Sequence, residues 1–171
     1  TVQVADLAFA SDRKEPLYPE LQGFVDSARE DGAPYALFNA SGLINRHHDL
    51  LSDYATVIAR LHSRGIRVVF TSHVHRDWDD DFTMARKLHA LAGREDDLVI
   101  DRLLTPAQVR ELASGAHLTV SGRMHLAILS LGQEIPVVCL ATRGKVEGLF
   151  EFFGLPDSVV EPRPGCGDEL V

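Results

Sequence analysis

Cysteine is scarce in this chain of 171 residues. Cys139 lies within an apolar run, and Cys166 lies in a tail rich in glycine and proline. Disulfide scaffolds need many cysteines, and structural zinc sites need closely spaced pairs of them. The sequence therefore argues against both, and we expect two reduced thiols.

Long apolar runs and an excess of positive charge are also missing. The chain has no run of about 18 apolar residues of the kind that spans a bilayer. Its first ten residues, TVQVADLAFA, lack the basic start and long apolar stretch of a secretory signal. Lys and Arg number 17 against 25 Asp and Glu, a net charge of −8, whereas nucleic-acid binding requires a basic excess. We expect no nucleic-acid partner and a cytoplasmic location, with the inner face of the membrane as an alternative.

The remaining composition fits one soluble globular domain with a sizeable core, since 45% of residues are hydrophobic and 25% are charged. The chain starts at Thr1, without an initiator methionine, in a strand-like stretch at 2–9. We therefore expect a piece of a longer protein. We expect residues 1–33 to be the end of a preceding domain and a linker, residues 34–160 to be the carboxyl-terminal domain, and residues 161–171 to be an irregular tail.

Strand-like and helix-like stretches alternate through the predicted domain. The strand-like stretches are continuous apolar runs, as in parallel strands buried on both faces. Thr105 to Gln108 has the capping residue, proline and glutamine of a capping box. The sequence predicts an α/β fold of three layers that resembles a nucleotide-binding fold, with helices on both faces of a parallel sheet. The expected strands are 35–40, 66–72, 97–100, 118–121 and 136–141, and the expected helices are 21–30, 50–61, 80–91, 106–114, 122–131 and 145–153.

Open parallel sheets bind ligands at the carboxyl ends of their strands, where several candidate residues occur. Ser41 and Gly42 form a small polar turn whose hydroxyl and N–H groups can hold an anion, although ordinary turns also have this composition. Arg123 and His125 open a predicted helix, where a guanidinium and free N–H groups suit phosphate or carboxylate. Lys145 opens the next helix in the same way. Each of the three also has an alternative role: Arg123 pairs with an acidic neighbour, His125 is a satisfied histidine of the core, and Lys145 is a solvent-facing cation.

His73 follows the second predicted strand and has two interpretations. With His75 and Asp77 it forms the His-x-His-x-Asp spacing of binuclear zinc hydrolases. That pattern normally continues with another histidine, where this chain has Trp78. The three aspartates that follow are typical of a solvated helix start. Alternatively, His73 faces the ligand cleft as a neutral or charged hydrogen-bond donor.

The stretch 118–155 resembles the carboxyl-terminal signature of the polysaccharide pyruvyl transferases. It has a strand, Gly-Arg-Met-His, an apolar helix, a proline-led strand, Lys-Val and Gly-Leu in that order. The similarity extends upstream to YALFNASGLIN and VVFTSHVHRDWDDD, so it covers about Tyr35 to Leu155. Enzymes of that family are similar in architecture to two-domain glycosyltransferases of the GT-B type. The resemblance implies that this chain is the carboxyl-terminal half and that most of the N-terminal domain is missing.

By the same resemblance, Arg123, His125 and Lys145 contact phosphoenolpyruvate, with Arg123 and His125 as catalytic residues. The implied activity moves a pyruvyl group onto a sugar of a cell-surface polysaccharide as a ketal, without a metal or an organic cofactor. The implied acceptor is a sugar or a lipid-linked saccharide. Ser41, Gly42 and His73 complete the expected donor site, and this half alone is expected to bind donor without turnover. Many members have a tyrosine-containing loop where this chain has residues 141–144, a difference that bears on acceptor specificity.

Two other functions remain open at this stage. An enzyme of the same architecture can use a nucleotide-sugar donor, with a base pocket and a carboxylate for the ribose. A non-catalytic binding module of the same fold is the other alternative, and its mark is an Arg123 and His125 corner tied up in internal salt bridges.

Overall fold

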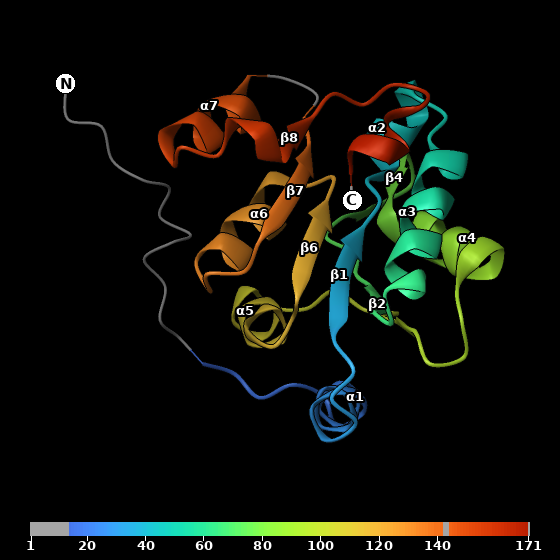
Figure 1. Cartoon of the computed structure of the whole chain (residues 1–171), viewed down its shortest axis with the longest axis vertical. Coiled ribbons are helices and arrows are strands. Elements are labelled where there is room, and N and C mark those ends of the chain that lie inside the picture. The colour runs from blue at the N-terminus through green and yellow to red at the C-terminus, as the bar shows by residue number, and fades with distance from the viewer. Residues whose placement is uncertain (1–13, 142–143, 171) are drawn as a thin grey trace.

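The computed structural model describes residues 14–141 and 144–170, which form a six-stranded sheet at the centre of the molecule (Figure 1). The strand order is β5-β2-β1-β6-β7-β8, and every neighbouring pair is parallel. All carboxyl ends therefore meet at one edge, as the sequence predicted. The strands are β1 (Tyr35–Asn39), β2 (Arg67–Phe70), β5 (Leu98–Val99), β6 (Leu118–Ser121), β7 (Val137–Leu140) and β8 (Val159–Val160).

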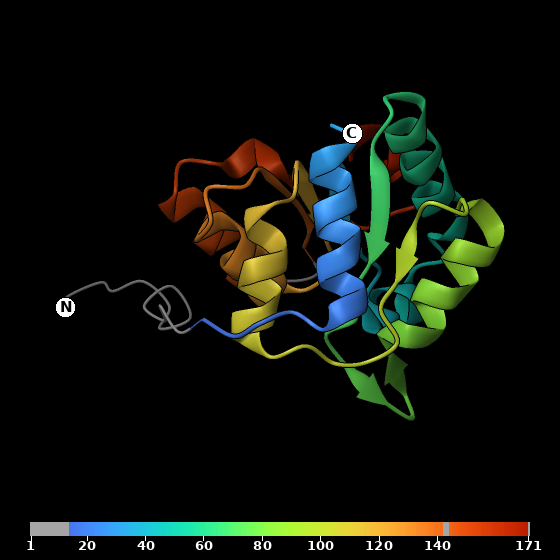
Figure 2. The same ribbon diagram turned by 90° about the horizontal axis from the view of Figure 1, so that it is seen from below.

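Helices cover both faces of the sheet, which confirms the predicted three-layer α/β fold (Figures 1 and 2). One face carries α3 (Leu51–Ser63), α4 (Asp81–Ala92) and the 3-10 turn η3 (Cys166–Glu169). The other carries α1 (Pro19–Glu30), α5 (Pro106–Ser114), α6 (Met124–Leu131) and α7 (Lys145–Phe152). The short helices α2 (Gly42–His47) and η2 (Pro156–Ser158) complete the described part of the chain together with a hairpin of β3 (His75–Arg76) and β4 (Asp79–Asp80).

Strand β1 shows why a continuous apolar run was the right signal. Successive strand residues point to opposite faces. Phe38 therefore packs edge-on against Tyr54 of α3, with ring centroids 5.6 Å apart, whereas Tyr35 faces α1 and α5 and donates its hydroxyl to the Leu112 carbonyl at 2.6 Å. Both faces of the strand are buried, so both sets of side chains are apolar.

The capping box at α5 is confirmed in full. The Thr105 hydroxyl accepts from the Gln108 N–H at 3.2 Å, and the Gln108 side chain accepts from the Thr105 N–H at 3.1 Å. The sequence did not predict α2, the hairpin, η2 or β8, and it left the tail that contains η3 as irregular. The strand expected at 2–9 lies outside the described residues.

Both ends of the described chain pack on the domain. Helix α1 buries Leu21, Val25 and Ala28 against the sheet. In the tail, Cys166 is buried in the core beside α3, and the Gly167 N–H donates to Asp53 Oδ1 at 2.8 Å. Both cysteines are free thiols, as expected. None of the helices within residues 14–141 and 144–170 combines the length and apolar character needed to cross a bilayer.

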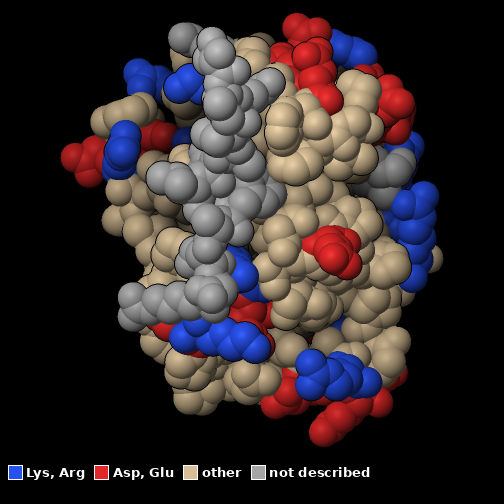
Figure 3. All heavy atoms as spheres, turned by 90° about the vertical axis from the view of Figure 1, so that its left-hand side faces the viewer, with Lys and Arg blue, Asp and Glu red and all other residues tan. Residues whose placement is uncertain are grey.

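Charges of both signs are interspersed on the face shown in Figure 3, mostly around the margins of a broad uncharged area. A continuous basic surface is the usual footprint of nucleic-acid binding. The visible part of this face does not form such a surface.

Candidate active site

A cavity of about 430 Å³ opens at the carboxyl edge of the sheet and gathers four of the predicted site residues. Ser41 follows β1, Arg123 and His125 follow β6, and Lys145 follows β7. Residues separated by more than a hundred positions meet there because parallel strands end at one edge. The rest of the lining consists of Leu43, Ile44, Gly122, Met124, Leu140 and Val146.

Two helices begin at this cavity. Helix α6 starts at Met124 after its N-cap Arg123, and α7 starts at Lys145. The N–H groups in the first turn of a helix have no intrahelical partner, and they give that end a partial positive charge. His125 and Lys145 are exposed, and within the described residues their side chains form no hydrogen bond or ion pair. The cavity therefore has two free cationic or titratable side chains and two helix starts that suit an anion.

Gly122 allows the turn after β6 to lie directly against the turn after β1. A Cβ atom at this position would lie 2.8 Å from Ser41 Cβ and 2.9 Å from Ser41 N, closer than packed carbon atoms approach. The Gly122 N–H also donates to the Asn39 carbonyl at 3.0 Å. Ser41 itself is the N-cap of α2, and its hydroxyl accepts from the Ile44 N–H at 3.4 Å. Glycine is required here by the close packing of the two turns and not by an unusual backbone angle.

Arg123 is held by two buried carboxylates. Its Nη2 donates to Asp79 and, at 2.7 Å, to Asp81 Oδ1, while its Nε donates to Asp81 Oδ2 at 3.3 Å. The arginine side chain is 14% exposed and the Asp81 side chain is wholly buried. Burial alone would raise the pKa of Asp81, but hydrogen bonds from Arg123 and the Gly42 N–H outweigh it and lower the pKa. One mark of the non-catalytic alternative, an Arg123 engaged in internal salt bridges, is therefore present.

Asp81 also joins the ends of neighbouring strands. Its Oδ1 accepts from the Gly42 N–H at 3.0 Å, so this N–H group is already used within the protein. Its Oδ2 accepts from the Asn39 side-chain amide at 3.1 Å and from the N–H groups of His73 at 3.0 Å and Val74 at 3.1 Å. One buried carboxylate thus fixes the segments that follow β1, β2 and β6.

His73 is partly buried and is not among the residues that line the cavity. Burial lowers the pKa of His73 to about 4, against the opposing effect of Asp81, and the neighbouring His125 and Arg123 lower it further. A histidine with this pKa is neutral near pH 7. If His73 contributes to ligand binding, it does so as a neutral donor or acceptor.

The zinc alternative finds no support in the geometry. Within residues 14–141 and 144–170, no three His, Cys, Asp or Glu side chains are grouped so that they could hold a metal ion. His75 is exposed and its Nδ1 lies 3.0 Å from Asp80 Oδ1. His73, His75 and Asp77 are therefore not a preformed ligand set.

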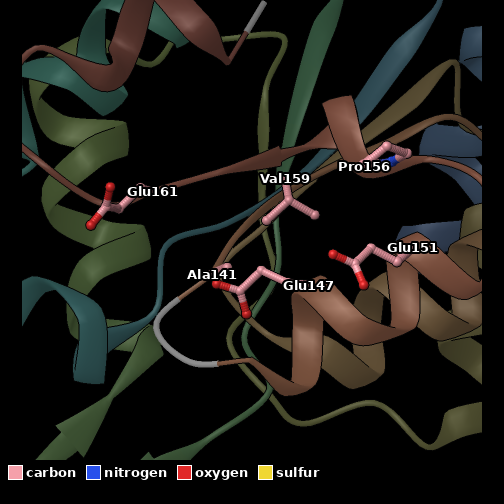
Figure 4. A pocket seen from close by; sticks show the side chains of 6 residues that line it. All are labelled: Ala141, Glu147, Glu151, Pro156, Val159 and Glu161. Carbon is pink, nitrogen blue, oxygen red and sulfur yellow. The ribbon is translucent and has the colours of Figure 1, made fainter.

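A second cavity, of about 450 Å³, lies at the carboxyl ends of β7 and β8 (Figure 4). Ala141, Pro156 and Val159 form its uncharged lining. Three carboxylates also line it: Glu147 and Glu151 from α7, and Glu161 after β8. Its acidic character distinguishes it from the cavity that contains Arg123 and Lys145.

The family model for polysaccharide pyruvyl transferase matches residues 1–144. The chain belongs to the polysaccharide pyruvyl transferase family. The matched part of this family member includes Ser41, Gly42, His73, Arg123 and His125 and ends immediately before Lys145. The resemblance noted from the sequence is thereby confirmed. No curated protein matches the chain.

A solved structure of a Listeria monocytogenes protein assigned as a UDP-N-acetylglucosamine 2-epimerase resembles this pyruvyl transferase family member, with a TM-score of 0.63 and 15% identity. The match covers 92% of this chain and 38% of that one, so the chain spans well under half of its neighbour's length. At such low identity the likeness concerns the fold alone. It confirms the predicted GT-B-like architecture.

Sequence reasoning missed Asp79 and Asp81, because three consecutive aspartates were interpreted as a solvated helix start. Only Asp80 has that role: it is the N-cap of α4 and accepts from the N–H groups of Phe82 at 3.2 Å and Thr83 at 3.1 Å. Asp79 and Asp81 alternate with it and point inward to Arg123. Alternation at i and i+2 was the available signal, since it places two of three residues on one face of an extended segment.

Proposed function

We propose that this member of the polysaccharide pyruvyl transferase family is the donor-binding half of an enzyme that moves a pyruvyl group from phosphoenolpyruvate to a sugar. The observation that carries the proposal is the convergence of Arg123, His125 and Lys145 on one cavity. All three were expected from the family signature to contact the donor, and they come from two different strand ends.

The charge of phosphoenolpyruvate, close to −3, suits this cavity. Lys145 is exposed and forms no ion pair within the described residues, and the first turns of α6 and α7 add partial positive charge. Arg123 uses Nε and Nη2 for its aspartates, and within the described part of the chain its Nη1 has no hydrogen-bond partner. Nη1 can therefore donate to a phosphate or carboxylate oxygen while the rest of the guanidinium stays fixed.

The proposed reaction begins with a proton transfer from His125 to the methylene carbon of phosphoenolpyruvate. The double bond is consumed, and the carbon that carries the phosphate becomes electrophilic. A sugar hydroxyl attacks this carbon, forms a C–O bond and loses its proton to a base. A second hydroxyl of the same sugar then attacks, also loses its proton, and displaces inorganic phosphate by cleavage of the C–O bond to the phosphate.

The products are a pyruvate ketal and phosphate, with no change of oxidation state overall. One of the two hydroxyl protons restores His125, and the other leaves with phosphate or water. A histidine suits the acid because its ordinary pKa is close to neutral pH. The base is a carboxylate nearby or a group of the other half of the enzyme. The scheme uses neither a metal nor an organic cofactor.

The proposed acceptor is a sugar of a cell-surface polysaccharide, free or lipid-linked, and the proposed place of reaction is the cytoplasm or the inner face of the membrane. In a GT-B-like enzyme the cleft lies between two domains, so turnover requires the other half. Ser41, Gly42 and His73 belong to this site in different ways. Ser41 lines the cavity, whereas Gly42 and His73 donate their N–H groups to Asp81, the carboxylate that holds Arg123.

Calorimetric titration of the chain with phosphoenolpyruvate tests the donor site. We expect saturable binding that weakens about tenfold or more in Lys145→Ala, because one full charge contact is lost. Lys87→Ala is the matched control, since Lys87 is an exposed lysine on α4. Equal affinities of the two variants, or no binding by the unmodified chain, would count against the proposal.

The acidic cavity favours a second candidate, a nucleotide-sugar donor. Such an enzyme needs a carboxylate for the ribose hydroxyls, and Glu147, Glu151 and Glu161 supply three at one place (Figure 4). The solved structure of similar fold is also named for a UDP-sugar. Three carboxylates in one cavity repel a diphosphate, however, which makes phosphoenolpyruvate in the cavity lined by Arg123, His125 and Lys145 the better-supported donor.

A further inference from the structure

The hairpin of β3 and β4 presents the only tryptophan of the chain at its tip. Trp78 is 54% exposed, although tryptophan is among the side chains that gain most from burial. A single exposed apolar residue is common on protein surfaces and indicates nothing by itself. The hairpin around Trp78, however, is fixed, lies beside the donor cavity and has a specific chemistry.

The base of the hairpin is anchored on both sides. Asp81 N–H donates to the Val74 carbonyl at 3.0 Å, and His75 Nδ1 lies 3.0 Å from Asp80 Oδ1. The His75 ring also packs edge-on against Phe82, with ring centroids 5.3 Å apart. Trp78 is therefore presented on a defined support. Tryptophan provides a large contact area for little loss of side-chain entropy, and a fixed backbone lowers the cost of binding further.

The hairpin is also joined to the donor cavity. Asp79, the next residue after Trp78, pairs with Arg123, which lines that cavity. Consecutive Cα atoms are 3.8 Å apart, so the Trp78 backbone lies next to that of the aspartate that pairs with Arg123. Figure 2 shows the hairpin projecting from the body of the domain, so its tip is open to a large ligand. A molecule that contacts Trp78 and the cavity together must be longer than a monosaccharide.

The chemistry of the tip selects among ligands. The Arg76 guanidinium lies 5.4 Å from the centroid of the Trp78 ring, on one face of the indole. The hairpin 75–80 contains one arginine and three aspartates, but Asp79 is buried and paired with Arg123. The exposed tip therefore has no excess of positive charge, which nucleotides and anionic lipids would require. An aromatic face next to both hydrogen-bond donors and acceptors fits a neutral pyranose, which has an apolar C–H face and a rim of hydroxyl groups.

We infer that Trp78 is an acceptor subsite that stacks on a neutral sugar of the saccharide, next to the residue that receives the pyruvyl group. This inference rests on the proposed function for its placement, because a saccharide is the acceptor in that reaction. The subsite itself can be tested without donor or turnover.

Trp78 reports on its own occupancy, since its fluorescence is the only tryptophan emission of the chain. The probes are methyl glycosides of glucose, galactose, mannose and N-acetylglucosamine, and disaccharides of the same sugars, up to about 100 mM, because single stacking contacts give dissociation constants on the order of millimolar. We expect a saturable emission change with at least one of them, tighter for disaccharides. Saturation-transfer NMR extends the measurement to variants. Trp78→Phe should retain binding and Trp78→Ala should weaken it about 3- to 10-fold.

Phe152→Ala is the control, because Phe152 is an exposed aromatic residue on α7, 49% accessible, away from the hairpin. Its sugar affinity should be unchanged, and both alanine variants should bind phosphoenolpyruvate as the parent chain does. Emission that no sugar changes, or that only anionic phospholipid vesicles change, overturns the subsite. If a sugar binds at Trp78 while phosphoenolpyruvate does not bind at all, the donor proposal fails and the subsite stands.

Discussion

Replacing Asp81 by asparagine removes the carboxylate that joins three strand ends, and the structure gives the size of the effect. Oδ1 accepts from the Gly42 N–H and Arg123 Nη2, and Oδ2 accepts from four further donors on Asn39, His73, Val74 and Arg123. An asparagine has a single oxygen, so its amide nitrogen must face donors at the other position. If the asparagine oxygen takes the Oδ2 position, the hydrogen bonds from the Gly42 N–H and from the charged Arg123 Nη2 are still lost. This loss lowers the free energy of unfolding by about 3 to 5 kcal/mol.

Asp97→Asn is the matched control. The Asp97 side chain is also wholly buried, and it accepts from the N–H groups of Val68 and Arg94 at 2.7 Å each and lies 2.9 Å from His62 Nε2. It contacts the starting half of β2, away from the carboxyl edge of the sheet. We expect a stability loss of similar order in this variant, with the donor site intact.

Amide hydrogen exchange and calorimetry separate the two variants. In Asp81→Asn, the Gly42 amide should exchange about 10- to 100-fold faster; if the asparagine side chain is flipped, the amides of His73 and Val74 should do so instead. In Asp97→Asn, the exchange rates of these three amides should not change. Phosphoenolpyruvate affinity should fall in Asp81→Asn only. Removal of a negative charge beside an anion site would by itself raise affinity, so a fall reports lost positioning of Arg123. Unchanged or tighter binding, or a stability loss under about 1 kcal/mol, would refute this reasoning.

Three further predictions concern pH and close packing. The pKa of His73 is about 4 in the fold against an ordinary value of 6.5, so the unfolded chain takes up the proton first and stability falls as pH drops from 6.5 to 4, by up to about 3 kcal/mol. In His73→Gln, denaturant titrations between pH 6.5 and pH 4 should no longer show this loss of unfolding free energy. If the variant loses as much stability over this range as the parent chain, the burial of His73 is not the cause. Gly122→Ala should lower the unfolding free energy by about 1 to 3 kcal/mol, because its methyl group meets Ser41, whereas Gly148→Ala on α7 has open space and should be neutral or stabilising. Equal melting temperatures for that pair would contradict the packing argument. In Gly167→Ala the new Cβ would lie 2.8 Å from the carbonyl oxygen of Asp53, so the tail should be released from this contact. Limited proteolysis after residue 160 should then become faster. If the variant resists the protease as well as the parent chain does, this contact does not anchor the tail.

The sheet and its covering helices were predictable because burial on both faces leaves a direct record in the sequence. Runs such as VVF in β2 and VVCL in β7 have no polar face, and only a parallel strand between two helical layers requires that. The carboxyl-edge rule then placed Ser41, Arg123 and His125 together without any knowledge of the distances between them.

The remainder depended on contacts between segments far apart in the chain. Nothing local distinguishes Asp79 and Asp81, which are buried against Arg123, from Asp80, which caps a helix. The strands β3 and β8 are two residues long and belong to no longer apolar run, whereas β5 lies in the apolar run 98–100 that the sequence analysis recognised. Gly122 allows the turns after β1 and β6 to touch, a contact between distant segments that no local pattern indicates.

The proposal that phosphoenolpyruvate is the donor is best tested by titrating the same chain with phosphoenolpyruvate and with UDP-N-acetylglucosamine. We expect saturable heat with phosphoenolpyruvate, at a dissociation constant on the order of 0.1 to 1 mM, and none with the nucleotide sugar. Saturable heat with UDP-N-acetylglucosamine, lost in a variant that replaces Glu147, Glu151 and Glu161 by glutamine, together with none from phosphoenolpyruvate, would contradict it.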